Sequence, residues 1–193
     1  MRSYKCLKMN QYALDGYVLL PIRQEDMMPI KDWRNAQLAV LRQKQPLTEA
    51  EQHRYFTTVV WPSFEEEKPK QLLFSLLRDT TGIGYGGIVH ISWEDRRGEV
   101  SFLLNPARVA EAGVYRQDFL AFLYLIKQAA YVGLGLNRLF TETFDIRPLH
   151  ISILEEAGFR LEGRMKQHRI VDGAFVDSLL HGHLKEYDCH VEE

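Results

Sequence analysis

The fold is decided by Gly98-Glu-Val-Ser-Phe-Leu-Leu-Asn-Pro106, Phe119-Leu-Ala-Phe-Leu-Tyr-Leu-Ile-Lys-Gln-Ala-Ala-Tyr131 and Arg138-Leu-Phe-Thr-Glu-Thr-Phe144. The first segment alternates between apolar and polar residues and predicts a strand, the second has helical apolar spacing, and the third predicts another strand. Residues 151–157 return to helical spacing. This order predicts a βαβα unit whose first strand leads into a helix amino terminus, where backbone N–H groups and the helix dipole can hold a phosphate. The pattern therefore indicates a phosphate-bearing cofactor.

Further strand and helix patterns flank this unit on both sides. One helix is expected to begin at Asp26, and Thr48 with Glu51 forms a capping box that opens a second helix through Phe56. Val171-Asp172-Gly173 has the composition of a hairpin turn. The remaining predicted strands are residues 17–22, 71–78, 83–93, 159–169 and 174–184.

Composition limits the classes of protein that fit. With 193 residues, 46% apolar and 26% charged, the chain suits one domain over residues 1–193 with a sizeable core. A net charge of −2 gives no electrostatic footprint for nucleic acid, and no apolar run approaches membrane-spanning length. Cys6 and Cys189 have no spacing typical of a disulfide framework or a zinc site. We therefore expect a monomer or homodimer of the reducing cytoplasm, with no metal and no nucleic-acid or membrane partner.

The order and spacing of these segments resemble the GNAT superfamily of acyl-CoA-dependent N-acetyltransferases over nearly the whole chain. Residues 17–35 look like the first strand and helix of that family, Gly133-Leu-Gly-Leu-Asn-Arg138 like its helix-to-strand corner, and Ile153-Leu-Glu-Glu-Ala-Gly-Phe159 like its last helix and following strand. The resemblance implies an α/β (α+β) fold with a mostly antiparallel seven-stranded sheet, splayed fourth and fifth strands, and helices on both faces.

Two branches of the superfamily are most similar, on Trp33-Arg34-Asn35 together with Glu162-Gly-Arg164 and Asp177-Ser178. One acetylates amino groups on nucleotide-linked sugars, and the other acetylates the amino terminus of ribosomal proteins. The resemblance also implies acetyl-CoA as the co-substrate. In the family the exposed backbone of the fourth strand holds the pantetheine arm and its end supplies the oxyanion donor; the matching residues are Phe102, Leu103, Leu104 and Asn105.

The phosphate-binding loop departs from the family pattern. The usual Gly-x-Gly before the long helix is missing, because Gln117 and Phe119 stand at those positions, and the loop from Pro106 to Asp118 is longer than usual. In one interpretation a modified phosphate site forms at the helix start, and in the other the arginines are ordinary surface charges and the site is degenerate. Asp118 is expected to cap the helix. We favour the modified site, built from Arg108, Gly113, Tyr115 and Arg116.

Proton transfer requires a base for the incoming ammonium and an acid for the leaving thiolate. Glu99 resembles in position the glutamate that begins the fourth strand in several superfamily members, and we expect it to be the base; the alternative is a solvated residue after a turn. The tyrosine that often serves as the acid is absent, because Leu154 stands at its position. His150 and Ser152 lie nearby and are the candidate replacements, although a histidine at a helix start is often only a cap or a packing residue.

The acceptor should be bound by the first helix and its exit. Arg34 and Arg42 could grip phosphates of a nucleotide-sugar, while Asn35 and Gln43 suit hydroxyl groups; the alternative is a solvated helix edge with Trp33 in the core. The candidate acceptor residues are Trp33, Arg34, Asn35, Arg42 and Gln43. We expect an acetyltransferase that acts on a small-molecule primary amine, preferably an amino sugar, by direct attack in a ternary complex. The alternatives are a protein amino terminus as acceptor, or an acyl-CoA-binding module without turnover.

Overall fold

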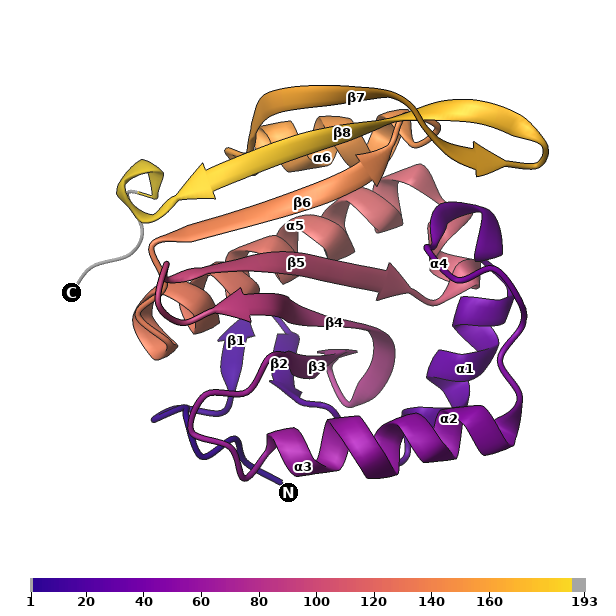
Figure 1. Cartoon of the computed structure of the whole chain (residues 1–193). Helices are drawn as coiled ribbons and strands as arrows, with labels where there is room; N and C mark the ends of the chain where they lie inside the picture. The colour runs from indigo at the N-terminus through magenta and orange to yellow at the C-terminus, as the bar shows by residue number, and fades with distance from the viewer. Residues whose placement is uncertain (1, 189–193) are drawn as a thin grey trace.

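A computed structural model describes residues 2–188, which form an eight-stranded sheet flanked by helices (Figure 1). The strand order across the sheet is β1-β2-β3-β4-β5-β6-β8-β7. The strands are β1 (Tyr12–Leu14), β2 (Tyr17–Pro21), β3 (Leu72–Arg78), β4 (Thr81–Ser92), β5 (Arg97–Leu104), β6 (Arg138–Phe144), β7 (Arg160–Val171) and β8 (Ala174–Leu184). The predicted α/β fold with a mostly antiparallel sheet is confirmed. The expected number of seven strands is wrong by one, because the three-residue strand β1 is too short to give a periodic signal.

One pair of neighbouring strands interrupts the antiparallel pattern. Strands β5 and β6 are parallel and share only three residue pairs, Arg97 with Arg138, Gly98 with Leu139, and Glu99 with Phe140. Beyond Glu99 the two strands diverge, and the ribbons separate toward the right of Figure 1. The expected splay between the fourth and fifth predicted strands is thus present, and we call the opening between β5 and β6 the wedge.

The helices cover both faces of the sheet. Neighbouring residues of β4 show this, because the Tyr85 hydroxyl bonds Arg34 of α1, whereas a Cβ built on Gly86 would lie 2.5 Å from the Phe122 ring of α5. The faces are therefore an α1 face and an α5 face. The helices are α1 (Met27–Asn35), η1 (Leu38–Val40), α2 (Glu49–Tyr55), η2 (Phe56–Val60), α3 (Trp61–Ser63), α4 (Pro106–Val109), α5 (Ala112–Gln128), η3 (Ala129–Gly133), α6 (Pro148–Glu156) and η4 (Lys185–Tyr187).

The capping box that the sequence predicts is confirmed at the start of α2. The Thr48 hydroxyl accepts from the Glu51 amide at 3.2 Å, and the Glu51 carboxylate accepts from the Thr48 amide at 2.8 Å. This reciprocal pair satisfies two amides that have no partner within the helix. It fixes where α2 begins, and with it the length of the loop that leads from α1 across the wedge.

Helix α5 begins at Ala112, well before the predicted start near Phe119. The expected long loop is instead the short helix α4 followed by the first turns of α5. Asp118 is therefore inside the helix and is not its cap. Its carboxylate is fully buried and accepts hydrogen bonds from the Arg108 guanidinium at 2.5 and 2.9 Å and from the Tyr17 hydroxyl at 2.8 Å.

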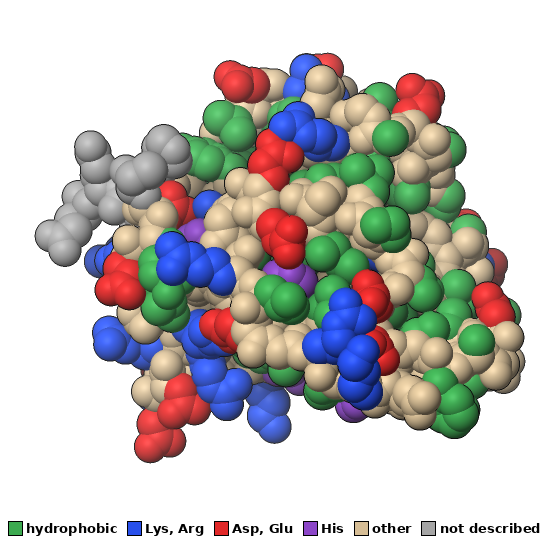
Figure 2. Space-filling view, turned by 90° about the horizontal axis from the view of Figure 1, so that it is seen from above, with side chains coloured by type: hydrophobic (Ala, Val, Ile, Leu, Met, Phe, Trp, Pro, Cys, Tyr) green, Lys and Arg blue, Asp and Glu red, His purple; other side chains and the backbone are tan. Residues whose placement is uncertain are grey.

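On the side above β7, β8 and α6, lysine and arginine side chains are interspersed with aspartate and glutamate (Figure 2). Within residues 2–188, no helix is long and apolar enough to cross a membrane. Cys6 is a free thiol. Cys189 lies outside the described residues, so the prediction that these two cysteines form no disulfide framework is not tested for that residue.

Candidate active site

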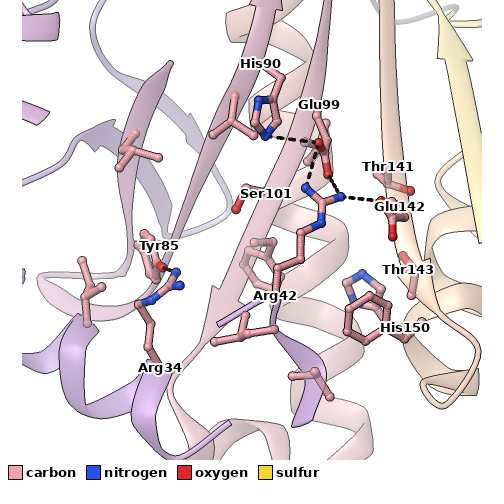
Figure 3. A pocket seen from close by; sticks show the side chains of 18 of the residues that line it. Arg34, Arg42, Tyr85, His90, Glu99, Ser101, Thr141, Glu142, Thr143 and His150 are labelled. Carbon is pink, nitrogen blue, oxygen red and sulfur yellow. Dashed lines mark hydrogen bonds and ion pairs between the residues drawn. The ribbon is translucent and has the colours of Figure 1, made fainter. Parts of the chain in front are cut away.

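The wedge opens into a pocket of about 480 Å³ that reaches both faces of the sheet. Because β5 and β6 have separated there, side chains from the α1 face and the α5 face line the same space (Figure 3). From the α1 face it is lined by Arg34, Arg42, Tyr85, Glu99 and Glu142, and from the α5 face by Val100, Phe102, Phe119, Thr141, Thr143 and His150. Such a pocket allows two substrates to meet from opposite sides of one sheet.

Two glutamates on the α1 face hold one guanidinium between them. Arg42, on the loop after η1, donates to Glu99 at 2.6 and 3.3 Å and to Glu142 at 2.9 Å. The Glu99 and Glu142 side chains are only 11% and 13% exposed, and Figure 3 shows Arg42 reaching up between them. His90 approaches Glu99 to 3.7 Å. Glu99 is therefore a buried pocket carboxylate and not a solvated residue after a turn.

The other predicted acceptor residues divide into two groups. Arg34 lines the pocket and donates to the Tyr85 hydroxyl at 2.7 Å and to the Gln43 amide oxygen at 2.8 Å. Asn35 and Gln43 do not line it; they bond each other at 3.0 Å, and Asn35 also bonds the backbone of Leu47. Trp33 packs against the hydrophobic core. Arg34 and Arg42 therefore face the pocket, while Asn35 and Gln43 hold the loop that carries Arg42.

The predicted cofactor residues of β5 lie along the wedge. Phe102 lines the pocket on the α5 face and stacks on Phe119 with ring centres 4.6 Å apart, and Leu103 and Leu104 are buried. Asn105 ends the strand and caps α4, where its side-chain oxygen accepts from the Ala107 amide at 3.0 Å. Within residues 2–188, the edge of β5 that would face β6 has no strand partner after Glu99. A chain with amide groups can pair with such an edge by main-chain hydrogen bonds.

His150 lies inside the pocket at the start of α6. Its Nδ1 is 2.6 Å from the Tyr115 hydroxyl, and its ring stacks on Phe119 at 4.3 Å between centres. Burial, followed by the positive charge of Arg147 and the nearby His181, lowers the pKa of His150 well below its usual value. The imidazole is therefore neutral near pH 7. Ser152 is exposed, does not line the pocket, and donates its hydroxyl to the Leu149 carbonyl at 2.9 Å.

The residues expected to bind phosphate are not brought together around one space. Arg108 is paired with the buried Asp118, and Arg116 is paired with Glu156 of α6. Gly113 is exposed on the first turn of α5. Tyr115 is buried, with its hydroxyl directed at His150 and accepting from Arg147 at 3.0 Å.

Several pocket residues were missed by the sequence analysis. Thr141, Glu142 and Thr143 alternate within β6, and only the strand order shows that Glu142 shares a face with Glu99. Arg147 precedes α6 and also lines the pocket. The sequence signal that could have identified the three β6 residues is their run of polar side chains in a strand that follows a long apolar helix. Within the described part of the chain, no group of three or more histidine, cysteine, aspartate or glutamate residues could hold a metal ion.

The mixed sheet that opens between two parallel strands, with a buried carboxylate at the opening and helices on both faces, matches the architecture that the sequence resemblance implies. The family model for the acetyltransferase (GNAT) domain matches residues 19–180. The chain therefore belongs to the GNAT family, and it is an acetyl-CoA-dependent N-acetyltransferase. No curated protein matches the sequence.

Solved structures show the same fold at low sequence identity. Spermidine N-acetyltransferase from Vibrio cholerae, in complex with CoA and spermine, is 15% identical with a TM-score of 0.76, over 89% of this chain and 97% of that chain. A dodecameric structure of the same enzyme in an intermediate state is 15% identical with a TM-score of 0.72, over 92% of this chain and 99% of that chain. A putative acetyltransferase is 16% identical with a TM-score of 0.67, over 93% of this chain and 88% of that chain. At these identities the similarity establishes the fold.

The wedge suits the pantetheine arm of acetyl-CoA better than the start of α5 suits its phosphates. The unpaired edge of β5 and the apolar side chains around Phe102 suit the pantetheine arm and its amide groups. The glycine cradle for the pyrophosphate is replaced by the first turns of α5, where Glu111 occupies the N-cap position. The wedge therefore suits the thioester end of the cofactor, whereas the start of α5 lacks the glycine cradle for its phosphates.

Proposed function

We propose that this protein transfers the acetyl group of acetyl-CoA directly to a primary amine of a small molecule, with Glu99 as the general base. The observation that supports this most strongly is the buried carboxylate of Glu99 at the point where β5 and β6 separate. An amine must lose a proton before or during its attack on the thioester carbon, and a carboxylate at the base of the wedge can accept it directly or through one water. Of the two cysteines, Cys6 does not line the pocket and Cys189 lies outside the described residues. Within the described residues no cysteine is placed to form an acyl-enzyme, which favours direct attack of the amine in a ternary complex.

His150 is our candidate for a donor on the cofactor side. Arg147 can only donate to the Tyr115 oxygen, so the Tyr115 hydroxyl is free to donate its own proton to Nδ1 of His150. A neutral imidazole that accepts at Nδ1 carries its proton on Nε2. We propose that Nε2–H donates a hydrogen bond to the developing oxyanion or to the leaving sulfur. Ser152 is left without a role, because its hydroxyl is directed at a backbone carbonyl.

The charge of the acceptor side supports an amine that also carries an anionic group. Two carboxylates, Glu99 and Glu142, are matched there by two guanidinium groups, Arg42 and Arg34. Arg34 has no carboxylate partner within residues 2–188, and Arg169 approaches Glu142 to 3.7 Å as a further cation. A pocket with this balance suits an amino sugar linked to a nucleotide phosphate, with Arg34 facing the phosphate.

A polyamine is the second candidate acceptor. The similar enzymes from Vibrio cholerae are spermidine N-acetyltransferases. The Glu99 and Glu142 pair already holds a cation, and an ammonium group could take the place of the Arg42 guanidinium. Either acceptor must displace Arg42 from Glu99, but a polyamine brings several positive charges into a pocket that already holds Arg34 and Arg42, whereas an amino sugar brings one.

A thiol-release assay over an acceptor panel tests the proposal. At saturating acetyl-CoA, the panel contains a nucleotide-linked amino sugar, spermidine and a peptide with a free amino terminus. We expect turnover with the sugar, and a loss of about tenfold or more in kcat/KM for Arg34→Gln with the sugar only. Preference for spermidine, with Arg34→Gln unchanged, would select the second candidate. Preference for the peptide would reject a small-molecule acceptor, and no turnover with any amine would reject the proposed reaction.

A further inference from the structure

A second cavity of about 240 Å³ adjoins the pocket of the wedge. Arg147, His150 and Val40 line both spaces, so the cavity continues from the α5 side of the wedge toward the surface between the starts of α5 and α6. We call it the side cavity. Val40, Val109 and Leu149 give it apolar walls, and Gln37 and Tyr115 add polar groups. Neither aspartate nor glutamate is among the described residues that line it.

Arg147 is the cation of the side cavity. Its contact with the Tyr115 hydroxyl, at 3.0 Å, is a bond to a neutral group, and within residues 2–188 no carboxylate lies within ion-pair distance of it. The other arginines near the starts of α5 and α6 differ in this respect, because Arg108 is paired with Asp118 and Arg116 with Glu156. Arg147 is thus the guanidinium that can accept an anionic ligand without giving up a carboxylate.

The charge of Arg147 acts on both groups that face it. Burial raises the pKa of Tyr115, and the positive charge of Arg147 opposes that rise. Burial and then the same charge lower the pKa of His150. The side cavity therefore has a positive charge at its wall, with no carboxylate among the described residues that line it.

The start of α5 is poorly suited to the phosphates. The N-cap residue is Glu111, whose carboxylate would repel them, and its side chain makes no capping hydrogen bond. The glycines that would let phosphates approach the backbone are replaced by helical residues, including the buried Phe119. The side cavity adjoins the wedge and offers a phosphate the guanidinium of Arg147 instead.

We propose that Arg147 binds the pyrophosphate of acetyl-CoA in the side cavity, and that the pantetheine arm passes His150 into the wedge. This rests on the use of acetyl-CoA and on the thioester position in the proposed function. The apolar side chains of Val40, Val109 and Leu149 contact the methylene and methyl groups of the arm. A guanidinium can bind two phosphate oxygens at once, which replaces the bonds that a glycine loop supplies.

Calorimetric titration with CoA and with S-acetylpantetheine, which lacks the phosphates, tests this assignment. We expect Arg147→Gln to weaken CoA binding by about tenfold to a hundredfold and to leave S-acetylpantetheine binding nearly unchanged. Arg147→Lys should recover part of the loss, and it keeps the test available if Arg147→Gln does not fold. Arg116→Gln is the matched control, because it removes a neighbouring arginine that already has a carboxylate partner.

Each result decides between the alternatives. An unchanged CoA dissociation constant in Arg147→Gln, or an equal loss for CoA and S-acetylpantetheine, would overturn the proposal. A loss in Arg116→Gln larger than that in Arg147→Gln would place the phosphates at the start of α5. Because binding is measured without an acceptor, a dependence on Arg147 in a protein that acetylates no amine would reject the proposed function and keep this inference.

Discussion

At the scale of single residues, Arg42 and Glu99 pose a specific chemical problem. The carboxylate proposed as the base already accepts two hydrogen bonds from a guanidinium. A guanidinium cannot remove the proton that the ammonium must lose, since it stays charged at any relevant pH. In the proposed reaction Arg42 therefore either shifts toward Glu142, which it also bonds, or leaves with its loop when the acceptor binds.

The first prediction concerns Glu99. We expect Glu99→Gln to lower kcat by about a hundredfold to ten-thousandfold, the usual contribution of a general base, because an amide cannot accept the proton. The dissociation constant of acetyl-CoA should change little, since Glu99 lies on the α1 face and the cofactor residues lie along the wedge and the α5 face. Steady-state kinetics and calorimetry measure the two quantities.

Glu142→Gln is the matched control for that substitution. It removes the second carboxylate that holds Arg42, at a similar burial, while Glu99 remains. We expect it to change KM for the amine more than kcat. A Glu99→Gln enzyme with unchanged kcat at saturating substrates would remove Glu99 from the mechanism.

At the scale of elements, predictions from the sequence agree with the structure where the pattern depends on residues close together in the chain. The strand over residues 174–184 and the capping box at Thr48 agree with the structure, because alternation and capping depend on neighbours in the chain. The predicted start of α5 was wrong, because Arg116-Gln117-Asp118 has the polarity of a loop. Its Asp118 is buried by Tyr17 and Arg108, and such a tertiary contact leaves no periodic signal.

The same limit applies to the candidate site. Glu99 could be proposed because it occupies a position that the family pattern marks, and His150 because it is near the position of the missing tyrosine; both lie in the pocket. Glu142 and Arg147 could not, because their importance depends on which strand pairs with β6 and on what surrounds the start of α6. Arg108 and Arg116 were selected for their charge, which carboxylates distant in sequence neutralise.

The second prediction compares two arginines close together in the chain. Arg108→Ala should destabilise the protein by about 3 kcal/mol or more, because it leaves the buried Asp118 carboxylate with only the Tyr17 hydroxyl. Arg116→Ala should change the free energy of unfolding by less than about 1 kcal/mol, since its pair with Glu156 is exposed. Urea denaturation at pH 7 measures both, and equal effects would contradict the buried role of Asp118.

At the scale of the whole molecule, buried histidines connect stability to pH. His183 of β8 lies against Tyr131, whose hydroxyl is 2.8 Å from Nδ1. Burial and then the charge of Lys127 lower the pKa of His183 to about 4, and burial lowers that of His150 as well. The folded protein therefore holds both rings neutral at pH values where an unfolded chain, with a histidine pKa near 6.5, already binds protons.

The third prediction follows from that difference. Below about pH 6.5 the unfolded state binds more protons, so the free energy of unfolding should fall as the pH falls toward 4. His183 alone should contribute roughly 3 kcal/mol to this fall. We expect His183→Gln to show a shallower dependence in urea denaturation between pH 7 and pH 4.5. His53→Gln, at an exposed position of α2, gives the background effect of removing a histidine.

A result without pH dependence would contradict this account. If the wild-type protein kept the same free energy of unfolding between pH 7 and pH 4.5, the folded state would not require His183 to be neutral. If His183→Gln retained the full slope, other groups would be responsible, and His150 would be the next to test.

The free edge of β5 explains how such an enzyme can diverge so far in sequence. Every residue except proline offers the same amide and carbonyl along a strand, whatever its side chain. A co-substrate recognised through that edge places almost no demand on which amino acids compose it. Evolution can therefore exchange most side chains around the opening, which is consistent with a shared architecture at 15% identity. Under the proposed function, selection acts mainly on the few charged groups proposed to recognise the amine and the nucleotide end.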